Sequence, residues 1–301
     1  MRGEFRDGAV ITEKSQRLIK RNFGRVEGDR LILSPEEAAY LISKGILEVY
    51  DGKRVMDFED ILSHADPVRY FVFEDLRERG KKVSTRSFDD YIPIHESVTI
   101  SISELRDLEN KKIAVVDSEG EVSYFFVDYF NGRGEHEEEI KPFDAKFSGG
   151  FFVTGNLELH RRYFYGTERG GRVLLSIYEG LYLIEKEIMN VKEDFSRIYR
   201  VGQEIFPSFD RIYQIYRDLR EKRFMAKTGL KFGSEFRVYV KIRSLKELEH
   251  SKYLVRLKSD VSARELAGDV RLCNAVRKTL LYPVFEKNGN VSYISVRRVK
   301  F

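Results

Sequence analysis

Residues 31–42 read LILSPEEAAYLI, and residues 173–184 read VLLSIYEGLYLI. In each stretch an apolar run ends in Ser, a Glu follows three residues later, and an apolar helical pattern comes next. This spacing predicts a strand and then a helix that begins with a capping box, in which Ser and Glu bond each other's free backbone N–H groups. The two stretches lie 142 residues apart (176 − 34), which indicates an internal repeat.

Three further matches follow in the same order along the chain. They pair residues 70–78 with 213–221 at an offset of 143, the Ser-x-x-Glu-Leu pattern at 101–105 with 262–266 at 161, and the Gly-x-Val-Ser-Tyr pattern at 120–124 with 289–293 at 169. The order is kept and the offset only grows. We therefore interpret the chain as two diverged copies of one unit.

We predict an α/β (α+β-like) fold with mixed sheets, in which each copy begins with a small helical and hairpin subdomain. A helix, strands, a second capped helix and a closing hairpin follow in each copy. The Gly-rich, acidic linker is interpreted as a solvated connector. The predicted boundaries are 1–65 and 66–131 for the two parts of the first copy, 132–148 for the linker, and 149–209 and 210–301 for the two parts of the second copy.

The composition excludes several classes of protein. The chain has 301 residues, of which 42% are hydrophobic and 34% charged, so it can bury a core and is not a disordered chain. It has no apolar run of about 18 residues, so we expect no membrane span. Its single Cys, Cys273, excludes an internal disulfide framework and a Cys-based zinc site. We expect a cytoplasmic protein without a secretory signal.

The two copies differ in charge near their ends. Residues 101–148 contain 12 acidic and 6 basic side chains, whereas residues 221–301 contain 8 acidic and 19 basic ones. A concentrated basic domain favours a polyanion partner such as nucleic acid, although a solvated charged surface would look similar. The hairpin turn of the first copy is acidic, with Asp117, Glu119 and Glu121. Such a docking loop could bind a basic surface of a second chain, and twofold dimers are the commonest assembly.

Residues 227–239, KTGLKFGSEFRVY, have no comparable segment in the first copy. The alternation around Tyr239 predicts a half-buried strand on which Arg237 and Lys241 share its face. Nearby cations lower the pKa of a tyrosine, which a tyrosine base requires. Taken alone, Tyr239 could equally be an ordinary core or surface tyrosine.

Two further residues are candidates for the same chemistry. His250 lies in a polar segment and has a side chain suited to proton transfer, although an ordinary exposed histidine is an equal reading. Lys278 is expected to end a helix over residues 263–278, with Arg271 on nearly the same face. No partner lies at zinc-ligand spacing, so we expect no metal site. The first copy has Tyr91 and His95 at a different spacing, and we interpret it as catalytically inactive.

Together these residues resemble the archaeal tRNA-splicing (tRNA-intron) endonucleases. The resemblance rests on four segments in family order: YRDLR at 216–220, KTGLKFGSEFRVY at 227–239, HSKYLV at 250–255 and VRK at 276–278. It extends over the whole chain, because one subclass carries two tandem units and works as a homodimer. In that subclass the N-terminal unit is degenerate and keeps the acidic docking loop. The resemblance also implies a restriction-endonuclease-like sheet in the second part of each copy.

The sequence departs from the family pattern at two positions. Arg223 stands where the family has a glycine, which the first copy keeps as Gly80. Thr279 follows Lys278 where a second basic residue is common. Neither departure falls on a proposed catalytic position.

The resemblance implies a mechanism without metal or cofactor. Tyr239 acts as general base on a ribose 2′-OH, His250 protonates the leaving 5′-oxygen, and Lys278 stabilises the transition state. The products are a 2′,3′-cyclic phosphate and a 5′-OH end. The substrate is a precursor tRNA with a bulge-helix-bulge, and Arg271 and Arg298 match positions that hold a flipped base between two guanidinium groups.

Two other readings of the sequence stay open. The chain could be a non-catalytic RNA-binding or scaffold subunit, which would need only the basic charge and the duplication. It could also be a metal-dependent nuclease, for which Glu235 and Lys231 are the nearest candidate residues.

Overall fold

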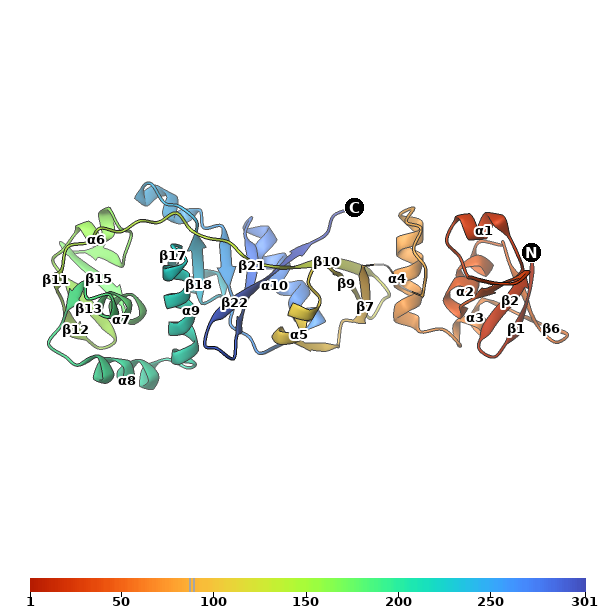
Figure 1. Cartoon of the computed structure of the whole chain (residues 1–301), viewed down its shortest axis with the longest axis horizontal. Coiled ribbons are helices and arrows are strands. Elements are labelled where there is room, and N and C mark those ends of the chain that lie inside the picture. Colours follow the sequence, from red (N-terminus) through yellow and green to blue (C-terminus); the bar gives the residue numbers. More distant parts are fainter. Residues whose placement is uncertain (87, 89) are drawn as a thin grey trace. The chain divides into compact units, whose positions relative to one another are not determined.

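A computed structural model describes residues 1–86, 88 and 90–301, and the chain falls into two units (Figure 1). The first unit contains residues 1–128, 260–271 and 296–301, and the second contains 129–259 and 272–295. Both units combine helices with mixed sheets, so the predicted α/β fold is confirmed. In the part of the chain that the structure describes, no helix is long and apolar enough to cross a membrane.

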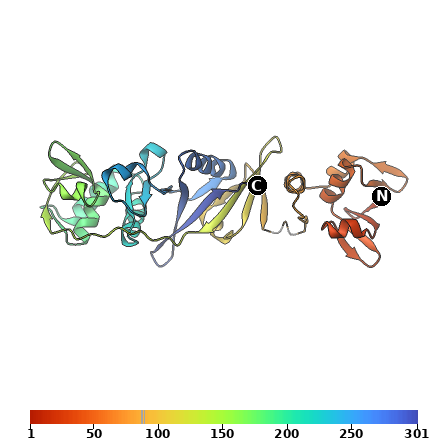
Figure 2. The same cartoon turned by 90° about the horizontal axis from the view of Figure 1, so that it is seen from above.

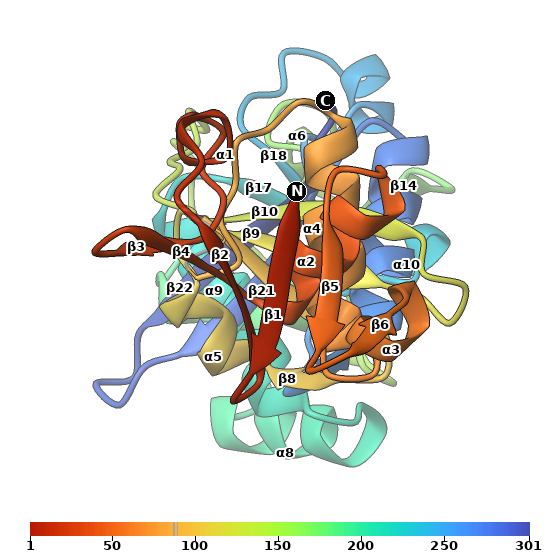
Figure 3. The ribbon, with the colours of Figure 1, turned by 90° about the vertical axis from the view of Figure 1, so that its right-hand side faces the viewer.

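The first unit begins with a six-stranded sheet in the order β3-β4-β2-β1-β5-β6, visible in Figure 3. Helix α2 packs beside this sheet and buries Ala38, Ala39, Tyr40 and Leu41 against it. The elements are β1 (Arg2–Arg6), β2 (Ala9–Glu13), α1 (Gln16–Lys20), β3 (Arg25–Glu27), β4 (Arg30–Leu33), α2 (Pro35–Ser43), β5 (Glu48–Asp51), β6 (Arg54–Met56) and α3 (Phe58–Leu62).

The rest of the first copy is built around helix α4, which Figure 2 shows almost end-on. Strand β9 pairs in parallel with β7 and antiparallel with β10, and the β9–β10 hairpin matches the predicted one. The elements are α4 (Pro67–Glu78), β7 (Tyr91–His95), β8 (Thr99–Ser101), α5 (Ile102–Asp107), β9 (Lys112–Val116) and β10 (Val122–Tyr129).

The second unit repeats this plan. Its first part contains a four-stranded sheet in the order β12-β13-β15-β14, a two-stranded sheet of β11 and β16, and three helices. The elements are β11 (Phe143–Asp144), β12 (Lys146–Ser148), β13 (Phe151–Thr154), α6 (Glu158–Arg161), β14 (Thr167–Arg169), β15 (Arg172–Ser176), α7 (Ile177–Glu185), β16 (Met189–Asn190) and α8 (Phe195–Ile205).

The second part of this unit places helix α9 beside strands in the order β17-β18-β19-β21-β22. Strands β19 and β21 are parallel, and β17, β18 and β19 are antiparallel neighbours. The remaining elements of the second copy are α9 (Phe209–Glu221), β17 (Met225–Thr228), the 3-10 helix η1 (Leu230–Phe232), β18 (Phe236–Tyr239), the 3-10 helix η2 (Leu245–Glu249), β19 (Tyr253–Val255), β20 (Asp260–Ser262), α10 (Ala263–Ala275), β21 (Thr279–Phe285) and β22 (Val291–Arg298). Of these, β20, which pairs with β8, belongs to the first unit, as do residues 263–271 of α10 and 296–298 of β22.

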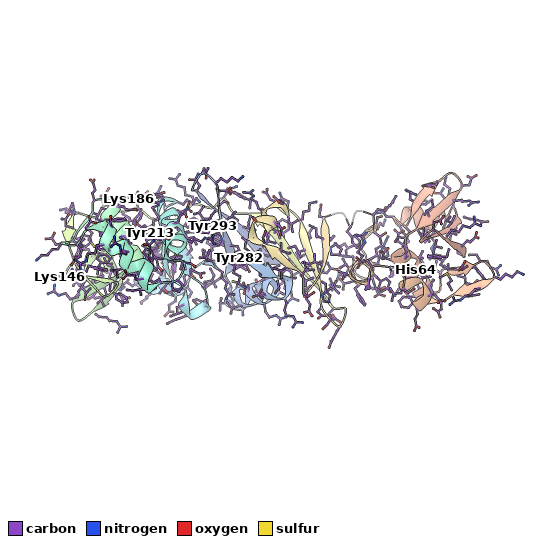
Figure 4. All side chains as sticks on the ribbon, turned by 90° about the horizontal axis from the view of Figure 1, so that it is seen from below. His64, Lys146, Lys186, Tyr213, Tyr282 and Tyr293 are labelled. Atoms are coloured by element: carbon purple, nitrogen blue, oxygen red, sulfur yellow. The ribbon has the colours of Figure 1, made fainter. Side chains whose placement is uncertain are left out.

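The same interactions recur in both copies, which confirms the internal repeat. The hydroxyl of Tyr124 donates to Asp75 at 2.7 Å, and that of Tyr293, labelled in Figure 4, donates to Asp218 at 2.8 Å. Each bond ties the last strand of a hairpin to the long helix of the same copy. All four predicted capping boxes are present, at Ser34/Glu37, Ser101/Glu104, Ser176/Glu179 and Ser262/Glu265.

One repeated carboxylate has different surroundings in the two copies. Glu179 is buried and accepts hydrogen bonds from Lys227 at 2.9 Å and from the backbone N–H of Gly166 at 2.8 Å. Burial opposes its ionisation, but Lys227 and the backbone donors outweigh that effect and lower the pKa of Glu179. Its counterpart Glu37 has no lysine, one of its oxygens has no hydrogen-bond partner among the described residues, and burial raises its pKa.

We predict that Lys227→Met destabilises the protein by about 3–5 kcal/mol at neutral pH, because Glu179 then lacks its buried partner. In the wild type the lowered pKa of Glu179 contributes stability above the unfolded pKa, and this contribution is lost as the pH falls through the folded pKa. Without Lys227 the pKa of Glu179 rises, so at low pH this carboxyl is protonated and no longer carries an unpaired buried charge. Urea unfolding should therefore show that the variant loses more free energy of unfolding, relative to the wild type, at pH 7 than at pH 4. Equal losses at both pH values would contradict this account.

Candidate active site

The second copy contains a β-hairpin that the described part of the first copy lacks. Helix α4 and strand β7 are separated by 12 residues, 79–90, whereas α9 and β19 are separated by 31 residues, 222–252. The longer segment carries β17, η1, β18 and η2, and the described residues of 79–90 form no strand. The insertion therefore adds two antiparallel strands to one edge of the sheet.

Tyr91 does not correspond to Tyr239. In the first copy β7 pairs in parallel with β9 and sets Tyr91 opposite Lys112, and in the second copy β19 pairs in parallel with β21 and sets Tyr253 opposite Thr279. Tyr91 is therefore the counterpart of Tyr253. The sheet register sets this equivalence, and residue spacing alone does not show it.

Two glycines make the turn between β17 and β18 possible. A Cβ atom on Gly229 would lie 2.4 Å from the hydroxyl and 2.6 Å from the carbonyl oxygen of Ser234. Gly233 has φ +59°, a left-handed conformation that favours glycine. The turn reverses the chain into β18, where Lys227 of β17 lies opposite Arg237.

Tyr239 ends β18 inside a small apolar cluster. Its side chain is 2% exposed and packs with Phe164, Met225 and Ile242. Its hydroxyl donates a hydrogen bond to the carbonyl of Leu248. Burial raises the pKa of Tyr239 and the charge of Arg237 opposes the increase. The expected net lowering of this pKa is therefore wrong, because desolvation outweighs the neighbouring cation.

The charge of Lys241, which was expected on the face of Tyr239, is instead taken up by Glu135. The ammonium of Lys241 donates to the Glu135 carboxylate at 2.6 Å.

Lys278 follows helix α10 and does not end it. The helix stops at Ala275, and Arg277 takes a left-handed conformation with φ +56°. The N–H of Lys278 then donates to the carbonyl of Cys273 at 2.8 Å, and that of Arg277 donates to Asn274 at 3.0 Å. This is a Schellman motif, which turns the chain into β21. The expected helix over 263–278 is therefore three residues too long.

The Lys278 ammonium points back to the segment that carries His250. It donates to the carbonyl of Ser251 at 2.9 Å and lies 5.5 Å from the ring centre of Phe232. Burial lowers the pKa of Lys278, and the charge of Arg237 lowers it further. A half-buried ammonium held in this way is available to stabilise negative charge close by.

The structure brings the three predicted catalytic residues to one short segment. Tyr239 bonds the carbonyl of Leu248, Lys278 bonds the carbonyl of Ser251, and the exposed His250 lies between these two positions. The N–H of His250 donates to the carbonyl of Glu247 at 2.9 Å, which fixes the backbone at the end of η2. Residues 248–251 are therefore the common support of the site.

The comparisons with known proteins assign the region around this site to a known family. Residues 209–293 match the family model of the tRNA intron endonuclease catalytic C-terminal domain, and these residues include Tyr239, His250 and Lys278. Residues 1–62 and 153–199 both match the N-terminal domain of the same family. The chain belongs to the tRNA intron endonuclease family. The match of the N-terminal domain to both copies also agrees with the duplication.

Curated archaeal relatives extend over nearly the whole chain. A tRNA-splicing endonuclease of Methanosarcina barkeri is 32% identical over 92% of this chain and 93% of its own length. One of Methanosarcina acetivorans is 33% identical with the same coverage, and one of Methanococcoides burtonii is 30% identical over the full length of both chains. The predicted resemblance to the archaeal tRNA-splicing endonucleases is thus confirmed.

The remaining predicted residues of this tRNA intron endonuclease lie on exposed positions, except for the half-buried Asp117. Arg271 is exposed on α10, and Arg298 is exposed at the end of β22. In the docking loop, the carboxylate of Asp117 accepts hydrogen bonds from the N–H groups of Glu119 and Glu121, both at 2.9 Å. Asp117 therefore fixes the turn. The exposed carboxylates of Glu119 and Glu121 give the loop a negatively charged surface.

Among the described residues no group of three or more His, Cys, Asp or Glu side chains is arranged to hold a metal ion.

Part of the linker is an ordered strap, which we define as residues 134–139. The N–H of Glu135 donates to the carbonyl of Val240 at 2.7 Å, directly after Tyr239. The buried guanidinium of Arg220 bonds Glu138, which also accepts from the hydroxyl of Tyr165 at 2.7 Å. The interpretation of these residues as a solvated connector is therefore wrong, because the strap joins the two parts of the second copy.

The strap also explains the arginine at a glycine position. Arg223 has φ +65°, as its counterpart Gly80 has φ +76°, and a non-glycine residue in this conformation costs roughly 1–2 kcal/mol. The carbonyl of Arg223 accepts from the N–H of His136 at 3.0 Å, and its guanidinium bonds Glu137. These contacts compensate for the conformational cost.

Sequence reasoning missed Arg237 as a part of this site and also missed the strap. The sequence predicts Arg237 only as a neighbour of Tyr239, whereas in the structure its guanidinium donates to the carbonyls of Thr228 at 3.0 Å and Leu248 at 3.3 Å. The alternation of apolar and polar residues predicts the face of the sheet on which Arg237 lies. It does not predict which backbone carbonyls Arg237 binds, because these belong to residues 9 and 11 positions away.

We predict that Gly134→Ala detaches the strap, because the added Cβ would lie 1.9 Å from the Arg223 carbonyl oxygen. The free energy of unfolding should fall by about 1–3 kcal/mol. Proteolysis within 132–148 should also become faster. Gly268→Ala is the matched control, because its Cβ meets no atom within 4 Å and alanine favours the α10 helix. A Gly134→Ala protein as stable and resistant as the wild type would contradict the strap's role.

Proposed function

We propose that this chain cuts introns out of precursor tRNA at bulge-helix-bulge sites, acting in the cytoplasm without a catalytic metal. The observation that supports this best is the attachment of Tyr239 and Lys278 to the backbone on either side of His250. This set lies in the family's catalytic domain. General base, general acid and a cation are the groups that internal transesterification of RNA requires.

In this proposal the phenolate of Tyr239 accepts the proton of the ribose 2′-OH at the splice site. The 2′-oxygen attacks the adjacent phosphorus, and the bond from phosphorus to the 5′-oxygen breaks. His250 gives a proton to that leaving oxygen, and Lys278 stabilises the extra negative charge on the phosphoryl group. The products are a 2′,3′-cyclic phosphate and a 5′-OH end.

Arg271 and Arg298 bind the substrate in this proposal. Both side chains are exposed. A base that leaves the stack in an RNA bulge offers both faces of its ring, and guanidinium groups bind such faces by stacking and cation–π contact.

The two copies have different tasks in this proposal. The first copy lacks the β17–β18 hairpin in its described residues and serves assembly, whereas the second copy catalyses. Two chains form a homodimer in which the docking loop of one binds the other. The second copy has a candidate receptor, a cavity of ≈ 700 Å³ between its two parts, lined in part by Arg169, Phe151 and Leu230. Phe151 and Leu230 are 51% and 83% exposed, and a partner would cover them.

We predict that Tyr239→Phe, His250→Ala and Lys278→Ala each lower the single-turnover cleavage rate by about 10²–10⁴-fold. The substrate is an intron-containing precursor tRNA with a bulge-helix-bulge, assayed in EDTA. Tyr91→Phe and His95→Ala in the first copy are matched controls and should cleave like the wild type. Cleavage by the wild type only after addition of magnesium would favour a metal-dependent nuclease. RNA binding without cleavage in either buffer would favour a scaffold subunit.

We predict that Glu119→Lys combined with Glu121→Lys weakens the dimer by about tenfold or more, since it reverses the charge presented to the partner. Analytical ultracentrifugation over a dilution series measures the dissociation constant. Lys287→Glu, in the equivalent turn of the second copy, should leave it unchanged. Equal dissociation constants for the wild type and the double variant would rule out the docking role.

A further inference from the structure

The carbonyl of Leu248 accepts hydrogen bonds from two side chains. One donor is the hydroxyl of Tyr239 and the other is the guanidinium of Arg237, at 3.3 Å. Arg237 also donates to the carbonyl of Thr228 at 3.0 Å. It therefore links three segments, namely the end of β17, its own strand β18 and the 3-10 helix η2.

In this arrangement Tyr239 cannot act on a substrate. Its side chain is 2% exposed and its proton is engaged by Leu248. The hydroxyl has to leave that carbonyl before it can accept a proton from a ribose 2′-OH. Breaking this hydrogen bond costs little free energy if the Leu248 carbonyl keeps another donor. It costs much more if the carbonyl is left without a hydrogen-bond partner.

The geometry points to Arg237 as a positioning residue that holds residues 241–250 over Tyr239 and keeps the Leu248 carbonyl bonded when Tyr239 turns to the substrate. This inference rests on the proposed function of the same site. Arg237 touches neither the substrate nor the reacting atoms in this account. It acts through Tyr239 and through the backbone next to His250.

The surroundings of Tyr239 leave Arg237 as its electrostatic partner. The apolar side chains that cluster with the ring come from four neighbouring segments: Phe164 after α6, Met225 in β17, Ile242 after β18 and Leu248 in η2. Among the described residues, Arg237 is the charged group that acts on the pKa of Tyr239. Lys241, two residues after Tyr239, is paired with Glu135 of the strap.

The charge and the shape of Arg237 should therefore have separable effects. The charge favours the phenolate of Tyr239, so a neutral residue moves the rising limb of the pH–rate profile to higher pH. The planar guanidinium reaches two carbonyls, Thr228 and Leu248, at once. A lysine keeps the charge but lacks this geometry. Arg237→Lys should therefore leave the rising limb of the pH–rate profile at the same pH and lower the maximum rate that the profile reaches.

The test compares Arg237→Gln and Arg237→Lys with the wild type in single-turnover cleavage of a bulge-helix-bulge RNA from pH 5 to pH 10. We expect Arg237→Gln to shift the rising limb to higher pH. We expect Arg237→Lys to keep the limb and to lose on the order of 100-fold in rate, as for a misplaced catalytic group. Arg161→Gln is the matched control, because Arg161 also makes two hydrogen bonds, to Glu168 on the surface of the second unit.

A second measurement needs no activity. Titration of ¹³Cζ-tyrosine signals by NMR, with Tyr239 assigned from Tyr239→Phe, should give a higher phenol pKa in Arg237→Gln than in the wild type and Arg161→Gln. An unshifted pH–rate limb together with an unchanged titration would overturn the inference, whatever the loss in rate. If the wild type does not cleave the RNA, the proposed function fails, and the titration still decides the role of Arg237.

Discussion

Two backbone carbonyls, those of Leu248 and Ser251, hold the site together. Each lies within two residues of His250, and each accepts a hydrogen bond from a side chain of another element, Tyr239 from β18 and Lys278 after α10. Carbonyl oxygens keep their position only while the backbone around them is fixed. The glycine turn, η2 and the strap supply that restraint, so the geometry depends on residues far apart in the sequence.

The two copies show which features belong to the fold and which to the site. The bonds from Tyr124 to Asp75 and from Tyr293 to Asp218 are the same in both, as are the capping boxes that begin their helices. These serve packing and survive divergence. The hairpin of β17 and β18 is a feature of the second copy, and Lys227 in this hairpin neutralises Glu179. The insertion thus carries Tyr239 and also joins the two parts of its own copy.

Features set by local chemistry could be predicted from the sequence. Capping boxes and hairpin turns depend on residues within four positions of each other, and all those predicted are present. Features set by distant partners could not. The helix before Lys278 ends at a left-handed Arg277, where no glycine marks the end. The order of the strap depends on Arg220 and Val240, about 80 and 105 residues away, and the burial of Tyr239 outweighs the cation beside it.

The central claim is that an RNA 2′-OH, activated by the residues around 248–251, is the nucleophile. A precursor tRNA with a single 2′-deoxy nucleotide immediately 5′ of one scissile phosphate tests it directly, because only that attacking oxygen is removed. The account predicts normal cleavage at the unmodified site and none at the modified one. Cleavage at the modified site at an unchanged rate would show that water is the nucleophile and would contradict the account.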